Sequence, residues 1–200
     1  MNANVDPDSR IIPDMQLIHE THRMSARLLI HAIPRPAISP KALIQLREFV
    51  VVSLRHHHET EVGLLWLHIM TVAPGAANAF AQLNRDYERL DAALARLADI
   101  ELACIATTTP SRRSSTSEAR NTLRVLCEAA TAVRDSLYTY LGHQEASLFP
   151  LFQGFVTRYQ WEEFLNGLTE SIPPISGHVM GFPRWISSAR SPIDAKADGT

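Results

Sequence analysis

The sequence predicts an all-α protein, an up-down-up-down four-helix bundle with a short extra C-terminal helix. Apolar residues recur every three or four positions through four long segments, as on one face of a helix. The connections between these segments are short or polar, which favours neighbouring antiparallel helices. No stretch alternates apolar and polar residues as a half-buried strand would. A length of 200 residues with 46% hydrophobic and 20% charged residues is ordinary for one globular domain.

The first two predicted helices are bounded by prolines. The first runs from about Met15 to Ile33, and Pro34 and Pro36 end it. Its inward stripe comprises Met15, Ile18, His22, Ser25 and Leu29. The second begins at Ser39-Pro40, with proline at the first helical position, and ends before a turn at 73–75. Its inward stripe comprises Leu43, Leu46, Val50, Ser53, His57 and Leu64.

The second half of the chain repeats this design. The third stripe comprises Phe80, Leu83, Tyr87, Leu90, Leu94 and Leu97. A polar loop is predicted at 107–117, and the fourth helix then runs to about Phe149, with Pro150 near its end. Its stripe comprises Leu123, Leu126, Ala130, Val133, Leu137, Tyr140, Gln144, Ser147 and Leu151. A fifth helical piece is predicted from Trp161 to Leu168.

The predicted domain organisation has four parts. Residues 1–12 form an N-terminal tail, residues 13–155 the bundle, residues 156–186 a C-terminal helical extension, and residues 187–200 a disordered tail without apolar periodicity.

The net charge and the length of the apolar runs indicate which partners are not expected. A net charge of -2 gives no sign of a nucleic-acid partner. No apolar run reaches about 18 residues, so no membrane partner is expected. The N-terminus lacks a secretory signal and there are only two cysteines, which predicts a cytoplasmic protein. The pattern does not indicate an oligomeric state.

Three side chains on the inward stripes predict a metal site. His57 and Glu61 are four residues apart and therefore lie on one face of a helix. His22 lies on the facing stripe of the first helix, so two imidazoles and a carboxylate would meet in the core. Such ligands suit iron, manganese or zinc. A single inward histidine is more often a hydrogen-bonded core residue, and that alternative stays open.

Four segments together resemble the ligand segments of hemerythrin-like (HHE cation-binding) domains. They are HETHR at 19–23, RHHHETEVGLLW at 55–66, RDYERLDAAL at 85–94 and YLGHQEASLFP at 140–150. The resemblance covers about residues 13–155. It implies a four-helix bundle whose segments present a His, a His-x-x-x-Glu, a His and a second His-x-x-x-Glu, which together hold a non-haem di-iron centre that binds oxygen or supports sensing and redox chemistry.

The first half of that ligand set matches and the second half departs from it. By resemblance, His22 takes the first His position, and His57 with Glu61 takes the first His-x-x-x-Glu. In the second half, the chain has Tyr87, Tyr140 and Gln144 at the expected ligand positions. A tyrosine oxygen can bind ferric iron as phenolate, whereas a glutamine carbonyl is a poorer ligand than a carboxylate.

Three states of the site are therefore possible. One is a single metal ion, expected to be iron, on His22, His57 and Glu61. Another is an altered two-metal site with tyrosinate ligands, and the third is a metal-free hydrogen-bonded cluster. His58 is an alternative to His57 as ligand, and His143 could flank the site from the fourth helix. His19 is expected at the surface, with a supporting role at the site as the alternative, and Glu145 is expected to be solvated.

The corresponding functions belong to three classes. The first is a metal-binding protein that binds a small diatomic or other small-molecule ligand, or senses redox state. The second is a metal-free bundle that binds a small organic molecule or a protein partner. The third is a non-haem iron enzyme of secondary metabolism.

Overall fold

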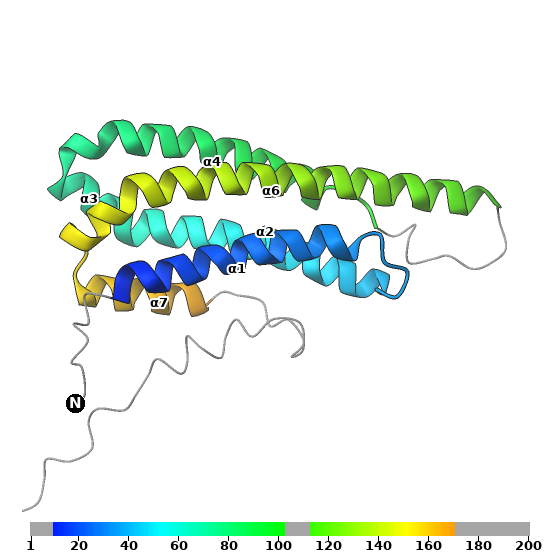
Figure 1. Ribbon diagram of the computed structural model, residues 1–200, viewed down its shortest axis with the longest axis horizontal. Coiled ribbons are helices and arrows are strands. Elements are labelled where there is room, and N and C mark those ends of the chain that lie inside the picture. The colour runs from blue at the N-terminus through cyan, green and yellow to red at the C-terminus, as the bar shows by residue number, and fades with distance from the viewer. Residues whose placement is uncertain (1–9, 103–112, 171–200) are drawn as a thin grey trace, which may run out of the picture.

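Four long helices lie side by side and confirm the predicted all-α helical bundle (Figure 1). They are α1 (Ile11–Ala32), α2 (Pro40–Glu61), α4 (Ala77–Ala98) and α6 (Arg113–Phe155). The structure is a computed structural model, and it describes residues 10–102 and 113–170. Within these two ranges the regular structure is helical throughout, with no strand.

The bundle core forms where the apolar stripes of the four helices meet. Helix α1 contacts α2 and α6, and α4 contacts the same two helices from the other side. The predicted stripes are buried nearly throughout, as at Met15, Val50, Leu90 and Leu137, none of which is more than 1% exposed. The 3.6-residue period thus selected the inner face of each helix correctly.

The starts of α1 and α2 follow from local chemistry. Helix α1 begins at Ile11, earlier than predicted, because Pro13 falls in the first turn, where backbone N–H groups have no helical partner to lose. Residues 10–12, expected in the tail, are therefore helical. At α2, the Ser39 hydroxyl accepts a hydrogen bond from the Ala42 N–H at 3.2 Å, and Pro40 opens the helix.

Helix α2 continues into a π-helical turn, η2 (Val62–Trp66), and then into α3 (Leu67–Val72). The Leu67 N–H bonds to the carbonyl of Val62, five residues back. This π-helical turn contains one residue more than the corresponding turn of an α-helix. As a result, the stripe prediction was wrong at Leu64, which is half-buried, while Leu65 takes the buried position at 1% exposure.

Helix α6 is longer than predicted at both ends. It continues through Pro150 to Phe155, because Leu148 and Phe152 on either side of the proline are fully buried and hold the last turns against the core. At the other end it begins at Arg113, so residues 113–117 of the predicted loop are helical. Residues 107–112 lie outside the described ranges.

The predicted fifth helical piece is present as α7 (Arg158–Glu170; Figure 1). It packs against α2 and η2. Its approach is close at Gly167, where an added Cβ would lie 2.9 Å from Cγ2 of Thr60. The His56 ring also lies 2.9 Å, through Nε2, from the Gly167 carbonyl oxygen, which accepts its hydrogen bond. The short 3-10 turn η3 (Pro74–Ala76) forms the turn predicted at 73–75. The remainder of the predicted C-terminal extension and the predicted tails at 1–9 and 187–200 are outside the described residues.

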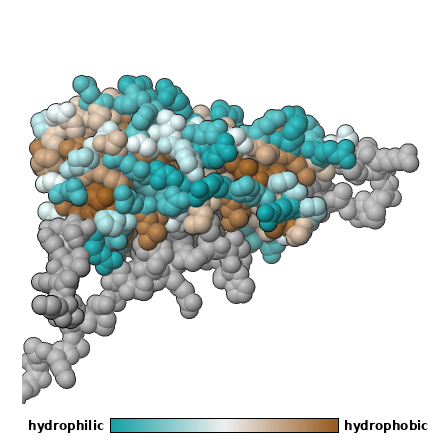
Figure 2. Space-filling view, viewed as in Figure 1, coloured by the Kyte–Doolittle hydropathy of each residue, from teal (hydrophilic) through white to brown (hydrophobic). Residues whose placement is uncertain are grey.

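The face of the described residues that Figure 2 shows mixes hydrophilic side chains with hydrophobic areas. No single helix in the described ranges is long and apolar enough to cross a membrane. The bent pair Pro40–Val72 and Pro74–Ala98, with 115° between its helices, meets that test by length and composition alone.

Candidate functional site

Five polar side chains from three helices meet in the bundle core. Helix α1 contributes His19 and His22, α2 contributes His57 and Glu61, and α6 contributes Gln144. Each of these residues is at most 2% exposed. We call this group the core polar cluster. Residues three or four apart share a helix face, so each pair on α1 and α2 projects inward together.

Distances within the cluster are short. The ring centroids of His22 and His57 are 5.0 Å apart, and those of His19 and His57 are 5.5 Å apart. Nε2 of His57 lies 3.6 Å from Oε2 of Glu61, which is an ion-pair distance rather than a good hydrogen bond. The Gln144 amide donates a short hydrogen bond to the same Glu61 oxygen. The predicted trio of His22, His57 and Glu61 is therefore found together.

Several polar atoms of the cluster lack hydrogen-bond partners among the described residues. They are Nε2 of His19, both ring nitrogens of His57, Oε1 of Glu61 and Oε1 of Gln144. Buried polar atoms in folded proteins are nearly always paired. Unpaired nitrogens and oxygens concentrated around one carboxylate are the atoms that a bound cation would contact.

Burial sets the charge of the imidazoles. For His22, burial lowers the pKa well below its ordinary value, and the neighbouring His57 and His19 lower it further. For His19, burial also lowers the pKa, and it outweighs the opposing effect of the hydrogen bond to Glu145. Both rings are therefore neutral at pH 7, the form in which histidine binds metals.

The Glu61 carboxyl is ionised despite its burial. Burial alone would raise its pKa, but the nearby His57, followed by His19 and His58, lowers the pKa below its ordinary value. The cluster thus combines the neutral imidazoles of His19 and His22 with one buried carboxylate, and a buried charge requires compensation.

Two phenylalanines cover the cluster. Phe149 of α6 stacks on His19 at 5.7 Å between ring centroids, and Phe164 of α7 meets His57 edge-on at 6.0 Å. Both phenylalanines belong to the apolar core. Helix α7 therefore contributes directly to sealing the site.

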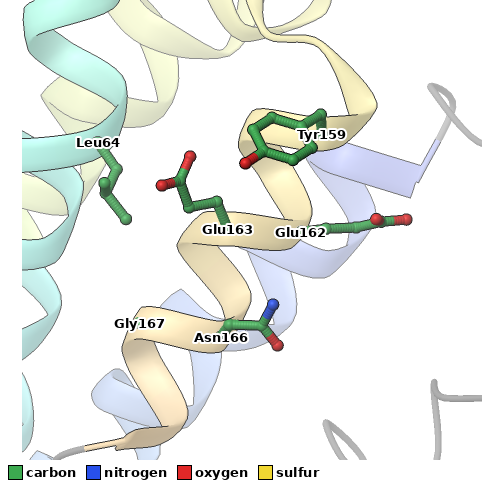
Figure 3. A pocket seen from close by; sticks show the side chains of 6 residues that line it. All are labelled: Leu64, Tyr159, Glu162, Glu163, Asn166 and Gly167. Atoms are coloured by element: carbon green, nitrogen blue, oxygen red, sulfur yellow. The ribbon is translucent and has the colours of Figure 1, made fainter.

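The nearby surface hollow is separate from the cluster. It lies between α7 and η2 and is lined by Leu64, Tyr159, Glu162, Glu163, Asn166 and Gly167. Figure 3 shows Glu163 of α7 pointing across this hollow toward Leu64. No member of the core polar cluster lines it.

Tyr87 and Tyr140 both contact His58. Nδ1 of His58 and the Tyr140 hydroxyl are hydrogen-bonded at 2.9 Å, and the His58 ring stacks on Tyr87 with 3.3 Å between centroids. Burial raises the pKa of Tyr87 to about 12 and that of Tyr140 well above its ordinary value, so both phenols are neutral. The structure thus places His58 with the tyrosines and His57 with Glu61.

His19 and Glu145 were predicted wrongly. His19 is fully buried, because the buried face of α1 is wide enough to include it beside Ile18 and His22. Its Nδ1 lies 2.9 Å from Oε1 of Glu145, and that oxygen also accepts a hydrogen bond from Arg23 at 2.7 Å. Burial would raise the pKa of Glu145, but these two partners lower it below its ordinary value. The carboxylate is only 27% exposed.

His143, considered as a flanking residue, turns away from the cluster. Its side chain is 52% exposed and Nδ1 bonds to Oδ2 of Asp86 at 2.8 Å. Asp86, which the stripe analysis missed, is buried at 2% exposure and also accepts hydrogen bonds from Gln82 and Arg89. Asp86 directly precedes Tyr87, which lies on the predicted inward stripe. This neighbouring position was the one sequence signal that could have indicated its burial.

The cluster does not present an assembled metal site. In the described ranges, no group of three or more His, Cys, Asp or Glu side chains is arranged to hold a metal ion as it stands. Neither ring nitrogen of His57 has a hydrogen-bond partner in these ranges.

Comparison with models of known protein families, with curated proteins and with solved structures found no match. The resemblance to hemerythrin-like domains therefore depends on the four sequence segments alone.

Proposed function

We propose that this chain is a hemerythrin-like, metal-binding protein that holds non-haem iron in the bundle core through His22, His57 and Glu61. In this proposal it binds a small ligand such as oxygen, or senses redox state. The observation that carries it is the set of buried, unpaired lone-pair atoms on His57 and Glu61, next to the His22 ring.

The chemistry of the donors supports a transition-metal ion. Neutral imidazole and carboxylate ligands suit iron, with manganese and zinc as alternatives. The negative charge of the buried Glu61, close to the neutral rings of His19 and His22, favours a cation. When bound, iron would supply a redox-active centre and a place for a small ligand. His22, His57 and Glu61 would hold it, and Gln144 would orient Glu61 through its hydrogen bond.

The surroundings of the cluster favour a small ligand over a large one. Phe149 and Phe164 lie against its histidines, and the hollow beside α7 is lined by other residues. A diatomic molecule can reach such a site through small fluctuations of packed side chains, whereas a bulky organic substrate would require α7 to move.

Metal content per chain tests the proposal. Protein purified without a histidine tag is loaded with ferrous iron under anaerobic conditions, freed of excess iron and measured by mass spectrometry. We expect wild-type protein to retain iron and His22→Ala and His57→Ala to lose it. His31→Ala, an exposed histidine of the same helix α1, is the control and should retain iron like wild type. Wild-type protein that retains no iron would overturn the proposal.

A metal-free bundle that binds a small organic molecule or a protein partner is the second candidate. Two observations favour it: Gln144 already provides a donor to Glu61, and the donors are not assembled around one point. On this alternative, wild-type and His22→Ala proteins would both lack iron, and the substitution would change only stability. The third class, an iron enzyme, has less support because Tyr87 and Tyr140 contact His58 and not the Glu61 carboxylate.

A further inference from the structure

His143 of α6 and Asp86 of α4 form a hydrogen-bonded pair at the surface of the bundle. Nδ1 of His143 is 2.8 Å from Oδ2 of Asp86, across the contact between α4 and α6, which lie side by side (Figure 1). The Asp86 side chain is only 1% exposed, whereas that of His143 is 52% exposed. The pair therefore joins a buried carboxylate to an imidazole that solvent can reach.

The Asp86 carboxylate is held in place and ionised. Both of its oxygens accept hydrogen bonds from the Gln82 amide at 3.1 Å, and Oδ1 also accepts one from Arg89 at 2.8 Å. Burial would raise the pKa of Asp86, but the hydrogen bonds from His143 and Gln82 lower it below its ordinary value. An ionised carboxylate only accepts hydrogen bonds, so Nδ1 of His143 carries the ring proton. In the neutral ring the lone pair is then on Nε2, at the edge that faces away from Asp86.

This combination distinguishes His143 from the other histidines of the described ranges. His19 also contacts a carboxylate through Nδ1, but its Nε2 is buried. In His56 and His68, Nε2 is hydrogen-bonded to a backbone carbonyl oxygen. His31 is exposed but has no carboxylate behind its ring in these ranges, and the remaining three are buried. His143 is therefore the histidine best placed to react with a molecule that arrives from solvent.

Arginines next to the pair favour a negatively charged reactant. Arg89, whose side chain is 66% exposed, contacts Asp86 directly. Arg85 donates a hydrogen bond to Gln82, which in turn bonds to Asp86. One carboxylate thus has two guanidinium groups around it. Guanidinium groups are the preferred protein donors to phosphoryl oxygens.

A small hollow beside the pair can take a compact ligand. Its volume is about 240 Å³, and it is lined by Asp86, Arg89, Asp135, Ser136 and Thr139. Thr139 precedes His143 by four residues, so the hollow lies one helical turn from the imidazole. The charge of Asp135 is offset by Arg134 at 2.7 Å, and the Thr139 hydroxyl bonds to the Asp135 carbonyl oxygen. Arg89 and Ser136 therefore remain as donors to a phosphoryl group.

We propose that His143 accepts a phosphoryl group on Nε2 from a small acyl phosphate, with Asp86 as its positioning residue. The lone pair of Nε2 attacks phosphorus and forms an N–P bond. The P–O bond to the acyl group breaks, and the carboxylate leaves with the electron pair. Nδ1 keeps its proton, so the ring becomes positive, and the adjacent Asp86 carboxylate stabilises that charge. This activity goes beyond the proposed function and requires no metal.

Labelling of chelator-treated protein with acetyl phosphate at neutral pH tests the proposal. Intact mass and phosphorus-31 spectra should show one phosphoryl group per wild-type chain, bound to nitrogen and released by mild acid. His143→Gln, whose amide can still donate to Asp86, should lose the label, and His31→Gln should keep it. Wild-type protein without a label, or a label that persists in His143→Gln, would overturn the proposal.

The role of Asp86 has its own measurement. Nitrogen-15 chemical shifts should show the Nδ1–H form of His143 in wild type. In Asp86→Asn the amide can donate to Nδ1, so the ring should change to the Nε2–H form and labelling should slow at least about 10-fold. A wild-type ring protonated on Nε2 would overturn the proposal.

A comparison within the wild-type chain does not depend on whether Asp86→Asn folds. Peptide mapping should show that His143 is labelled at least about 10-fold faster than His31, which lacks a carboxylate partner. Equal labelling of the two histidines would contradict the proposal. Faster hydrolysis of acetyl phosphate in wild type than in His143→Gln, with no phosphorylated chain, would also contradict it, because His143 would then act as a general base.

Discussion

Gln144 of α6 donates a hydrogen bond to the Glu61 carboxylate of α2 inside the bundle core. Both side chains are fully buried. The sequence resemblance leads one to expect a second carboxylate at this position. The Gln144 amide carries no charge and provides the Glu61 carboxylate with a hydrogen-bond donor.

The first prediction is that Gln144→Glu makes the metal-free protein less stable and its response to iron larger. Two buried carboxylates would repel each other, so one must take up a proton. Keeping that carboxyl protonated at pH 7, well above its ordinary pKa, should lower the free energy of unfolding by about 1–3 kcal/mol. Adding ferrous iron should raise the melting temperature more than in wild type, because a second carboxylate can coordinate. Urea unfolding and thermal melts, with chelator or with iron, measure both effects. Gln153→Glu, exposed on the same helix, is the control.

The second prediction concerns acid. The pKa of His58 is lowered from 6.5 to about 4, mainly because the ring is buried. Between these values the unfolded chain binds a proton that the folded protein does not. The stability that depends on a neutral His58 is therefore fully present above about pH 6.5 and is lost as the pH falls toward 4. A gap of about 2.5 pH units corresponds to about 3 kcal/mol. The lowered pKa values of His19 and His22 act in the same direction.

His58→Gln isolates this contribution, since glutamine can bond to Tyr140 but does not titrate. The stability lost by the chelated protein between pH 7 and pH 4.5 should be smaller in His58→Gln than in wild type, as measured by urea unfolding. In His31→Gln, which alters an exposed histidine, the pH dependence should be that of wild type. Equal losses in His58→Gln and wild type would show that His58 is protonated in the folded state.

The third prediction compares two glycines in helices. Alanine normally stabilises a helix interior by about 0.5–1 kcal/mol relative to glycine. At Gly142 an added Cβ meets nothing within 4 Å, so Gly142→Ala should show that gain. At Gly167 the Cβ would lie 2.9 Å from Cγ2 of Thr60, whose hydroxyl is bonded to the His56 carbonyl and resists rotation. Gly167→Ala should therefore lose stability.

Amide hydrogen exchange should localise this loss to α7. Faster exchange in Arg158–Glu170 with unchanged exchange in α4 is the expected result for Gly167→Ala. Equal stabilisation by both substitutions would mean that α7 does not pack closely on α2.

The fourth prediction concerns Asp86. This buried carboxylate accepts hydrogen bonds from His143 across the α4–α6 interface, and from Gln82 and Arg89 within α4. Asp86→Ala should lower the free energy of unfolding by about 1–3 kcal/mol, since its partners are exposed enough to be hydrated instead. Glu128→Ala breaks an exposed pair with Arg124 and should have a much smaller effect.

The pH dependence provides a second measurement on Asp86. Burial would raise its pKa, but the hydrogen bonds from His143 and Gln82 outweigh burial and lower it below its ordinary value. The contribution of Asp86 is thus present above about pH 4 and disappears as the pH falls further, and Asp86→Asn should lack this step.

Local periodicity was sufficient for the bundle and for the predicted trio of side chains. His57 and Glu61 are four apart, and His22 continues the stripe of Met15 and Ile18, so spacing alone placed them inward. Spacing does not reveal His19, because a stripe one residue wide leaves it out. The buried face of α1 is wider and includes adjacent positions such as Ile18 and His19.

Partners that come from distant parts of the chain were not predictable from spacing. His19 and Glu145 are 126 residues apart, and Asp86 and His143 are 57 apart. Each pair depends on the rotation of one helix against another, which a pattern of apolar residues fixes only coarsely. The hydrogen bond between Tyr140 and His58 depends on helix rotation in the same way.

The π-helical turn at Val62–Trp66 also bears on how the chain length can vary during evolution. This turn contains one residue in excess of a regular α-helix, directly after Glu61. Removing a single residue here, for example the exposed Gly63, would leave a continuous α-helix with the faces before and after it still directed at the core. Homologous chains are therefore expected to tolerate a one-residue gap at this point, where elsewhere in the helix a gap would turn His57 and Glu61 out of the core.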